Sequence, residues 1–410
     1  MKRVTALVIL AAIIVTLAAC GGGVTAENLT DGVEATPVNK TSYDYWDFYA
    51  GAAGFSLDLF RECRREQGGN TLISPISVLT AMAMAGTGAA GNTRYEMSDV
   101  FGLTLDDYAL QTALHDYISD LTSSDDAKFT SANSVWVRDD FKVLDSYLGD
   151  VRSYFGAEVF SAAFDDGTVK DMNNWVKHKT DKMIDQIIND LSDNDKMVLL
   201  NAVCFDAEWL IIYEETDMYD GEFTDINGDK KNVEFMRSNE WRYIEAGGAA
   251  GFIKSYKDGY SFAAILPGEG VELDAYIDSL TGDGFLSMIR NAEDCDVKAH
   301  LPKFSFDYDI SLSDALQSLG IVDAFTDDAD FSGMTGKTDL FIGDVLHKAH
   351  IDVDGKGTRA GAASAVIMAG KAAPGEPEEP KVVKLDRPFV FAIVDDIANL
   401  PLFIGAVETV

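Results

Sequence analysis

The histidines are the first side chains to test for acid–base, nucleophilic or metal chemistry. The sequence holds no HExxH pair, no GxSxG elbow and no GxxxxGK[ST] loop, so the usual arrangements for hydrolysis or phosphate binding are missing. Two histidines stand three residues apart in a predicted strand, and this spacing points them to opposite faces. The sequence therefore predicts no enzyme, no metal site and no cofactor. The five histidines are His115, His178, His300, His347 and His350.

One stretch near the C-terminus is unusual because most of its side chains are small. Residues 357–370 read GTRAGAASAVIMAG and carry a single charge, at Arg359. Alternate side chains of a strand face opposite sides, and one alternation here is free of charge. Taken alone, the stretch is equally consistent with a linker rich in alanine and glycine. The uncharged set is Thr358, Ala360, Ala362, Ser364, Val366 and Met368.

The predicted secondary structure that would position these residues begins with helices and continues mainly with strands. No linker divides residues 46–410, so we expect one large domain of the α+β class with large mixed sheets. A helix is predicted after Ser74 or Ser77, either of which can cap it. Two more helices are predicted, one with an apolar face at 55–63 and an amphipathic one at 167–192. Strands are predicted at 131–137, 197–205, 389–394 and 401–404, with short strands over 220–310.

The charge of the chain limits its partners. Acidic residues outnumber basic ones 68 to 33, which gives a net charge of −35. Such a charge repels nucleic acids and heparin-like polyanions, so neither is an expected partner. Cys63, Cys204 and Cys295 are odd in number and far apart, and we expect small apolar residues rather than a disulfide framework.

The N-terminus has the profile of a signal peptide. Lys2 and Arg3 precede an apolar stretch that is too short for a convincing transmembrane helix. Leu17-Ala18-Ala19-Cys20 resembles the bacterial lipobox, which implies cleavage after residue 19 and a lipid on Cys20; ordinary cleavage beside a chance cysteine is the alternative. Residues 20–45 are then a flexible tether, and the expected location is extracellular or on the cell surface, anchored to the membrane as a lipoprotein.

Several motifs, in order along the chain, resemble those of the serpin family of serine protease inhibitors. The first is NTLISPISVLTAMAMAGTGAAGNTRYEMSDV at residues 70–100. The resemblance covers roughly residues 46–408. Its further motifs are Asn133-Ser-Val-Trp136, Asn174-Trp175-Val176, Val198 to Phe205 with Trp209, Leu301-Pro-Lys-Phe, Asp330-Phe-Ser-Gly333, Val345-Leu-His-Lys-Ala349, Leu385 to Phe391 and Pro401-Leu-Phe-Ile-Gly405.

This resemblance implies the serpin fold, with three β-sheets surrounded by eight or nine helices and an exposed reactive-centre loop at about 355–384. A serpin inhibitor is cut in this loop, and the loop then inserts into the large sheet while the protease is still attached as an acyl-enzyme. Gly355 departs from the family, which usually has glutamate before the hinge. The hinge positions that match are Gly357, Thr358, Ala360, Gly361, Ala362 and Ala363.

The family's usual spacing from the hinge places the cleaved bond at Lys371–Ala372. A lysine there suits a trypsin-like protease, whose specificity pocket offers a carboxylate to a cation. Ala369 and Ala373 are alternatives that suit an elastase-like or subtilisin-like protease. The expected partner is a serine protease, in a covalent acyl complex.

The resemblance also implies a polar cluster under the sheet and a tryptophan where the loop enters it. The matching residues are Ser74, Ser77, Asn201 and His347 for the cluster and Trp209 for the point of entry. The protein is then a metastable monomer, and we expect loop–sheet polymers on mild heating. The rival functions are a serpin that is cleaved without trapping, as a carrier or chaperone, and a surface lipoprotein hydrolase.

Overall fold

A computed structural model of the chain describes residues 23–39, 45–103, 105, 108–121, 127–358 and 379–410. In this part of the chain, ten α-helices surround two hydrogen-bonded sheets, which confirms the predicted α+β class. The helices are α1 (Tyr45–Glu66), α2 (Pro75–Thr87), α3 (Gly91–Phe101), α4 (Ala109–Leu121), α5 (Asp145–Phe155), α6 (Asp166–Lys179), α7 (Leu273–Ser279), α8 (Gly282–Arg290), α9 (Ser313–Leu319) and α10 (Ser332–Thr335).

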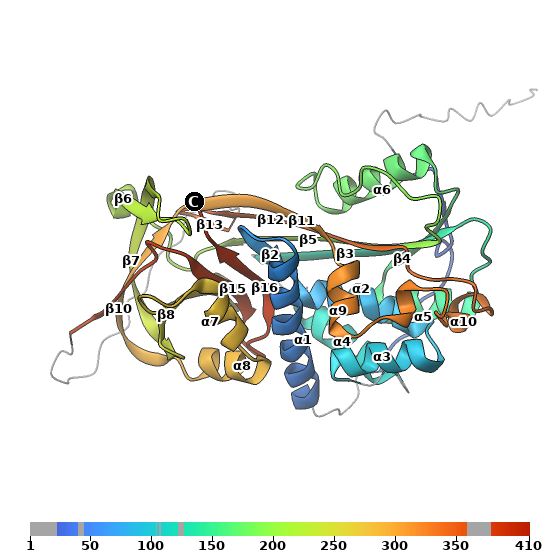
Figure 1. Cartoon of the computed structure of the whole chain (residues 1–410), viewed down its shortest axis with the longest axis horizontal. Helices are drawn as coiled ribbons and strands as arrows, with labels where there is room; N and C mark the ends of the chain where they lie inside the picture. The colour runs from blue at the N-terminus through green and yellow to red at the C-terminus, as the bar shows by residue number, and fades with distance from the viewer. Residues whose placement is uncertain (1–22, 40–44, 104, 106–107, 122–126, 359–378) are drawn as a thin grey trace, which may run out of the picture.

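The first sheet has seven strands and is central to the molecule. Figure 1 shows α6 on one side of its long strands and α2, α4 and α9 on the other. Burial on both faces explains why β5 is apolar from Met197 to Phe205 at every position except Asn201. In order across the sheet, the strands are β1 (Glu27–Asn28), β4 (Glu158–Ala162), β3 (Ala127–Arg138), β5 (Met197–Glu208), β13 (Gly357–Thr358), β12 (Asp344–Val353) and β11 (Phe304–Ser311).

The second sheet has nine strands because one long strand belongs to two parts of it. The 17-residue strand β7 pairs with β6 along its first half and with β8 along its second half. Two of the three expected sheets are thereby joined within the described residues. The strands are β14 (Lys381–Lys384), β10 (Glu293–Pro302), β7 (Lys230–Ala246), β8 (Ala249–Ser255), β9 (Tyr260–Leu266), β15 (Phe389–Asp395), β16 (Pro401–Val407), β2 (Thr71–Ile73) and, beside β7, β6 (Met218–Thr224).

Helix α2 lies under the first sheet and is buried on all sides. Every residue from Pro75 to Gly86 is buried, as expected for a helix that is apolar all round. Ser74 is its N-cap residue, although the serine side chain makes no capping hydrogen bond. Opposite α2, the smaller core between the sheet and α6 is built around Trp136, Phe160 and Trp175.

The predicted helix at 167–192 is wrong in its second half. Helix α6 ends at Lys179, and Asp181 and Lys182 have positive φ angles that a helix cannot contain. Beyond this point the chain is irregular, and the amide oxygen of Asn173 accepts hydrogen bonds from the backbone N–H groups of Ile187 and Ile188. The helical spacing of apolar residues therefore predicted correctly that the isoleucines are buried or partly buried, but predicted the wrong backbone conformation for this segment.

Part of the predicted tether lies against the domain. Strand β1 pairs with β4 at the edge of the first sheet. Asp171 of α6 accepts hydrogen bonds from the backbone N–H groups of Thr25 and Ala26 and from the Thr25 hydroxyl, at 2.7–2.9 Å. About residues 24–30 therefore lie against the domain, while most of residues 31–39 are exposed.

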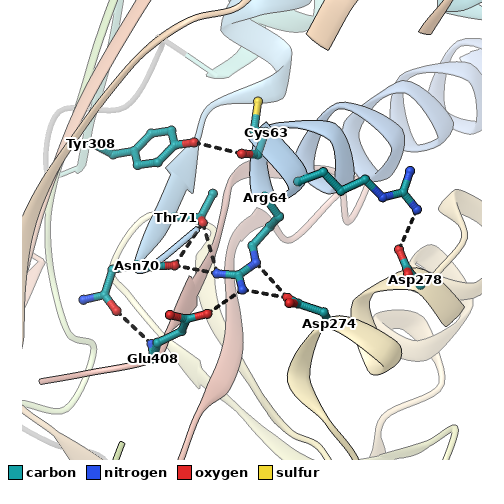
Figure 2. A network of polar contacts seen from close by, with 10 residues as sticks. Cys63, Arg64, Asn70, Thr71, Asp274, Asp278, Tyr308 and Glu408 are labelled. Atoms are coloured by element: carbon teal, nitrogen blue, oxygen red, sulfur yellow. Dashed lines mark hydrogen bonds and ion pairs between the residues drawn. The ribbon is translucent and has the colours of Figure 1, made fainter. Parts of the chain in front are cut away.

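A group of charged and polar residues, the Arg64 cluster, joins α1 to α7 and to the C-terminal end of the chain (Figure 2). The buried guanidinium of Arg64 donates hydrogen bonds to Asp274 Oδ1 at 2.6 Å, Glu408 Oε1 at 2.5 Å and the Thr71 hydroxyl at 3.3 Å. The amide oxygen of Asn70 accepts from the backbone N–H of Glu408. The cluster consists of Arg64, Asn70, Thr71, Asp274 and Glu408.

Two sequence predictions about the leader and the cysteines can be compared with the described residues. None of the helices in the described ranges is both long enough and apolar enough to span a bilayer. The signal peptide at 1–19 and the lipidation site at Cys20 lie outside those ranges. Cys63 and Cys204 are buried, Cys295 is partly buried, and the described residues contain no disulfide between them.

Candidate functional site

The two central strands of the first sheet are joined along most of their length and parted at one end. Strands β5 and β12 pair in parallel over six positions, from Val198 opposite Asp344 to Val203 opposite Ala349. Beyond this stretch, β13 lies between them and pairs antiparallel with both. The first two residues of an additional strand therefore already occupy the opening.

The two hinge residues in this opening are tightly enclosed. Thr358 is only 2% exposed, and its hydroxyl shares a 2.5 Å hydrogen bond with the hydroxyl of Tyr256. A Cβ atom on Gly357 would lie 2.1 Å from the backbone oxygen of Ala207, so no other residue fits without moving β5. The predicted hinge positions Ala360, Gly361, Ala362 and Ala363 lie outside the described residues.

Trp209 lies where the sequence comparison expected it, at the parted end of β5. Its indole N–H donates to the backbone oxygen of Asp354, and its ring stacks on Tyr256 with centroids 4.2 Å apart. The backbone N–H of Tyr213 donates to the oxygen of Gly355. Any Cβ on Gly355 would lie 2.4 Å from Met218 Cε, so a glutamate here would have to displace Met218. The unusual glycine therefore fits its surroundings.

Three polar side chains lie opposite one another on three adjacent strands under the joined part of the sheet. Asn133 on β3 is in register with Asn201 on β5, which is in register with His347 on β12. The Asn201 amide group donates to Asn133 Oδ1 at 2.6 Å, and Asn201 Oδ1 is 2.6 Å from His347 Nδ1. This row crosses the line along which β5 and β12 would have to separate.

Two serines continue the row toward α2 and β3. Asn201 Nδ2 also donates to Ser77 Oγ at 2.5 Å, and Ser77 Oγ lies 2.6 Å from Ser131 Oγ. We call Ser77, Ser131, Asn133, Asn201 and His347 the polar row. Because every member is uncharged and hydrogen-bonded to another member, the row satisfies groups that would be costly to bury alone.

His347 is held in one protonation state by its neighbours. The backbone N–H of Ser74 donates to Nε2 at 3.2 Å, so this nitrogen is an acceptor and the proton is on Nδ1, facing Asn201 Oδ1. Burial lowers the pKa of His347 to about 3. Both observations describe a neutral imidazole.

Three of the four predicted cluster residues meet through their side chains, and Ser74 meets them through its backbone. The buried hydroxyl of Ser74 has no hydrogen-bond partner in the part of the chain that the structure describes. The predicted reactive-bond residues Lys371, Ala372, Ala369 and Ala373 lie outside that part.

Sequence reasoning missed Ser131, Asn133 and Tyr256 as members of the site. The first two are polar at i and i+2 in a strand that also holds Thr130 and Ser134, so they share one face, and that spacing was a weak signal. Tyr256 carried no such signal, because it follows β8 and reaches Trp209 only in the folded chain.

The two histidines on β12 point to opposite faces, as predicted. His347 is buried in the polar row, and Nδ1 of His350 lies 2.8 Å from Asp307 Oδ1 on β11. Within the described residues, no three histidine, cysteine or carboxylate side chains gather in a way that would hold a metal ion.

Comparison with known proteins agrees with this geometry. The profile described as Serpin (serine protease inhibitor) matches residues 50–410. The chain belongs to the serpin family. A serpin-like protein of Thermococcus kodakarensis is 32% identical over 357 residues, which cover 86% of this chain and 83% of that protein. Intracellular coagulation inhibitor 2 of Tachypleus tridentatus is also 32% identical, over 84% of this chain and 88% of the inhibitor.

Two solved structures of the thermophilic serpin tengpin distinguish between states of the fold. The native state is 43% identical and has a TM-score of 0.87, covering 94% of this chain and all of that one. The latent state is 40% identical and has a TM-score of 0.77, covering 92% of this chain. This serpin is therefore more similar to the native form, in keeping with the direct pairing of β5 and β12. Serpins are generally inhibitors of proteases rather than enzymes.

Proposed function

We propose that this serpin is a suicide-substrate inhibitor of serine endopeptidases, and that its cleaved reactive loop enters the first sheet between β5 and β12. One observation carries the proposal: Gly357 and Thr358 already form strand β13 in that opening, paired with both neighbours. The large sheet is thus built to accept the residues that follow.

The two registers of β13 define where later residues would go. Thr358 lies opposite Ala207 on β5 and Val353 on β12. The loop would run antiparallel to both strands, so each later loop residue would lie opposite an earlier residue of β5 and of β12. If the pairing continues without a bulge, both registers place Ser364 between Asn201 and His347. The loop would thus bring a hydroxyl into the polar row at the point where the Asn201–His347 hydrogen bond is broken.

The same register accounts for the side chains that the loop would bury. Alternate loop residues, counted from Thr358, would point to the same side as Thr358 and face the main core beside Phe205, Val203 and Leu199. All of these loop residues are uncharged, so their burial is not opposed by the cost of burying a charge. The one charged residue, Arg359, would lie opposite the half-buried Asp206 at the end of β5. A cross-strand pair of opposite charges is favourable there.

The proposed reaction begins as ordinary proteolysis. The protease serine attacks the carbonyl carbon of Lys371, an ester forms to the serine oxygen, the bond to Ala372 breaks, and a proton passes to the leaving amine. Insertion of the loop then moves the attached protease away before water attacks the ester. A lysine at this position favours a trypsin-like target, and cleavage after Ala369 or Ala373 would favour an elastase-like or subtilisin-like one.

Incubation with trypsin and with elastase, followed by denaturing gels, tests the proposal. We expect a complex that survives detergent with one of them, and N-terminal sequencing of the released C-terminal fragment identifies the cut bond. The clipped protein should melt well above the intact one, because insertion adds strand pairs on both sides. Cleavage without a complex and without a rise in melting temperature would instead indicate a carrier or chaperone.

The variant Thr358→Arg tests insertion separately from cleavage. It would place a cation in a site that is 2% exposed, at a cost of several kcal/mol. We expect the loop to be cut as before while the stable complex is lost, and Thr358→Ser should restore the complex. Equal complex yields for the arginine and serine variants would contradict the insertion mechanism.

Two further parts of the proposal rest on the sequence and the family. Loop–sheet polymers are expected on mild heating, and one solved structure similar to this chain, at 41% identity and a TM-score of 0.77, is described as a loop C-sheet serpin polymer. Attachment to the membrane through Cys20, outside the cell, is tested by mass spectrometry of the mature N-terminus and by the variant Cys20→Ala, which should release the protein.

A further inference from the structure

A short stretch of β7 has no strand along one edge, and a hollow forms there. Strand β6 pairs with β7 as far as Met236, and β8 begins to pair at Arg242. Between these points, the loop that follows Trp209 closes over β7 and leaves a half-open hollow of about 550 Å³. Strand β7, which lines the hollow, lies at the same end of the molecule as β6 and β13 (Figure 1).

The floor of the hollow is a buried ion pair that is fixed in place. Lys254 Nζ donates to Glu240 Oε1 at 3.0 Å and to the oxygen of Ile211 at 3.1 Å, and the two charged side chains are 3% and 6% exposed. The ammonium group also lies 4.4 Å from the ring centroid of Tyr213. Since the Tyr213 backbone is hydrogen-bonded to Gly355, the floor is rigid and the hollow is formed in advance of any ligand.

The rim is cationic although the chain as a whole is strongly acidic. Arg237 and Lys298 line the hollow, and in the described part of the chain neither forms an ion pair; Arg237 donates only to the oxygen of Thr216. The carboxylate of Asp217, also on the rim, accepts a hydrogen bond from the backbone of its own turn at Glu214. Two cations are therefore directed to solvent at one place in a protein of net charge −35.

A neutral histidine and an apolar wall complete the lining. Burial, and then the positive charges of Lys384 and Arg237, lower the pKa of His300, whose Nδ1 is 2.6 Å from the Tyr219 hydroxyl. Two apolar lining residues are also open to solvent: Trp241 is 56% exposed and Ile212 is 38% exposed. An exposed indole beside an exposed isoleucine offers a flat apolar surface that water wets poorly.

We propose that this hollow binds a small aromatic anion, with its ring on Trp241 and Ile212 and its carboxylate or sulfonate on Arg237 and Lys298. The guanidinium fork of Arg237 matches the two oxygens of a carboxylate. The buried pair Lys254–Glu240 is neutral in sum, so Asp217 is the one uncompensated carboxylate among the described residues that line the hollow. A cation or a purely apolar ligand would leave the two rim cations unused.

Calorimetric titration of the intact protein with 2-naphthoate tests the site, and its neutral amide, 2-naphthamide, is the matched probe. We expect saturable binding of the carboxylate, at least about tenfold tighter than the amide. The double variant Arg237→Gln with Lys298→Gln should lose about tenfold or more in affinity for the carboxylate and little for the amide. The control is Arg290→Gln, because Arg290 lies 4.5 Å over the half-exposed Trp46 and does not line this hollow.

Three results would overturn the proposal: equal affinity for carboxylate and amide, an equal loss in the Arg290→Gln control, or binding that does not saturate. Circular dichroism of each variant verifies that the fold is intact. If the double variant instead slows complex formation with a protease and leaves naphthoate binding unchanged, the face docks a protein and the ligand proposal is wrong. No protease is present in the titration, so its failure leaves the inhibitor proposal untouched.

Discussion

The Arg64 cluster and the polar row are both polar networks that reach into the core, but they are built from different chemistry. In the Arg64 cluster, Arg64 is buried while the Asp274 side chain is 72% exposed. The Arg64 cluster uses a guanidinium and two carboxylates to hold together α1, α7 and the C-terminal end of the chain. The polar row uses two amides, a neutral imidazole and two hydroxyls to connect α2, β3, β5 and β12. One network is charged and the other is neutral.

This difference agrees with what each region would do under the proposed mechanism. A buried charge that loses its partner is very costly, so an ion-pair network belongs where the chain stays in place. Neutral hydrogen bonds exchange partners at a small net cost, because a new hydroxyl can replace an old one. Of the two networks, the neutral one is the one that crosses the line along which β5 and β12 would part.

The largest expected effect follows from removing the charge of the Arg64 cluster. Arg64→Met would leave Glu408 partly buried without its cation, and we expect a loss of about 3–5 kcal/mol in both the intact and the cleaved protein. Differential scanning calorimetry of both forms measures it. The control is Arg65→Met, whose exposed pairs with Glu62 and Asp278 should contribute little to stability. A larger loss in the intact form alone would contradict the comparison.

A smaller and unequal effect is expected in the polar row. Asn201→Ala would leave Asn133 Oδ1 and His347 Nδ1 without their partner, at a cost of about 2–3 kcal/mol in the intact protein. The cleaved protein should lose less, because Ser364 would supply a hydroxyl to the same place. Melting temperatures of both forms and the rate of polymer formation at a fixed temperature are the measurements.

The matched variant in the other network is Asn70→Ala. It should lower both melting temperatures by a similar amount, because the hydrogen bonds of Asn70 to Glu408 and Thr409 do not depend on the loop. If Asn201→Ala also affected both forms equally, the polar row would be an ordinary part of the core.

The polar row should make the stability of the protein depend on pH, through the titration of His347. The pKa of His347 is about 3 in the folded protein and about 6.5 in an unfolded chain, so the unfolded state binds the proton first as the pH falls. The contribution of neutral His347 is complete above about pH 6.5 and declines steadily toward pH 3. We expect His347→Gln to flatten the fall in melting temperature between about pH 7.5 and 5.

The control for this measurement is Ser131→Ala, which weakens the same row without removing a titrating group. It should keep the slope of the wild-type protein. An unchanged slope in His347→Gln would show that other groups carry the pH dependence in this range.

The smallest effects are expected from single hydroxyls at the edges of the two networks. Ser131→Ala removes hydrogen bonds to Ser77 and Asn133, and Thr71→Val removes two long ones, to Arg64 and to the Gly69 oxygen; each variant should cost about 1 kcal/mol. Ser131→Ala should also speed polymer formation, whereas Thr71→Val should not. Chemical denaturation together with native gels after heating tests both expectations.

The sequence predicted the elements best where a segment is buried on all sides. The apolar run of β5 and the alanine-rich α2 are recognisable from composition, since few polar residues interrupt them. The segment after Lys179 was mispredicted because its apolar residues keep a helical spacing, while the side chain of Asn173 binds its backbone in an irregular form. The spacing of apolar residues indicates which of them are buried. The backbone conformation of this segment depends on hydrogen bonds to the side chain of Asn173, which lies 14 and 15 residues earlier in the chain.

The candidate site was predicted in part. The family motifs supplied Ser77, Asn201 and His347, and the structure brings their side chains together. Ser74 contributes its backbone, and Ser131 and Asn133 were not foreseen as partners. Nothing in the sequence shows that Trp209 stacks on Tyr256, because that contact depends on how the two sheets pack.

By itself, the sequence determined which residues leave water and which segment is small enough to become a buried strand. These properties are local, because the cost of burying a side chain depends mainly on its own size and charge. Only the tertiary structure decided that Asn201 meets Asn133 and His347, which are 68 and 146 residues away along the chain. Such meetings depend on the register of three strands, and a shift of one residue would turn every one of these side chains to the other face.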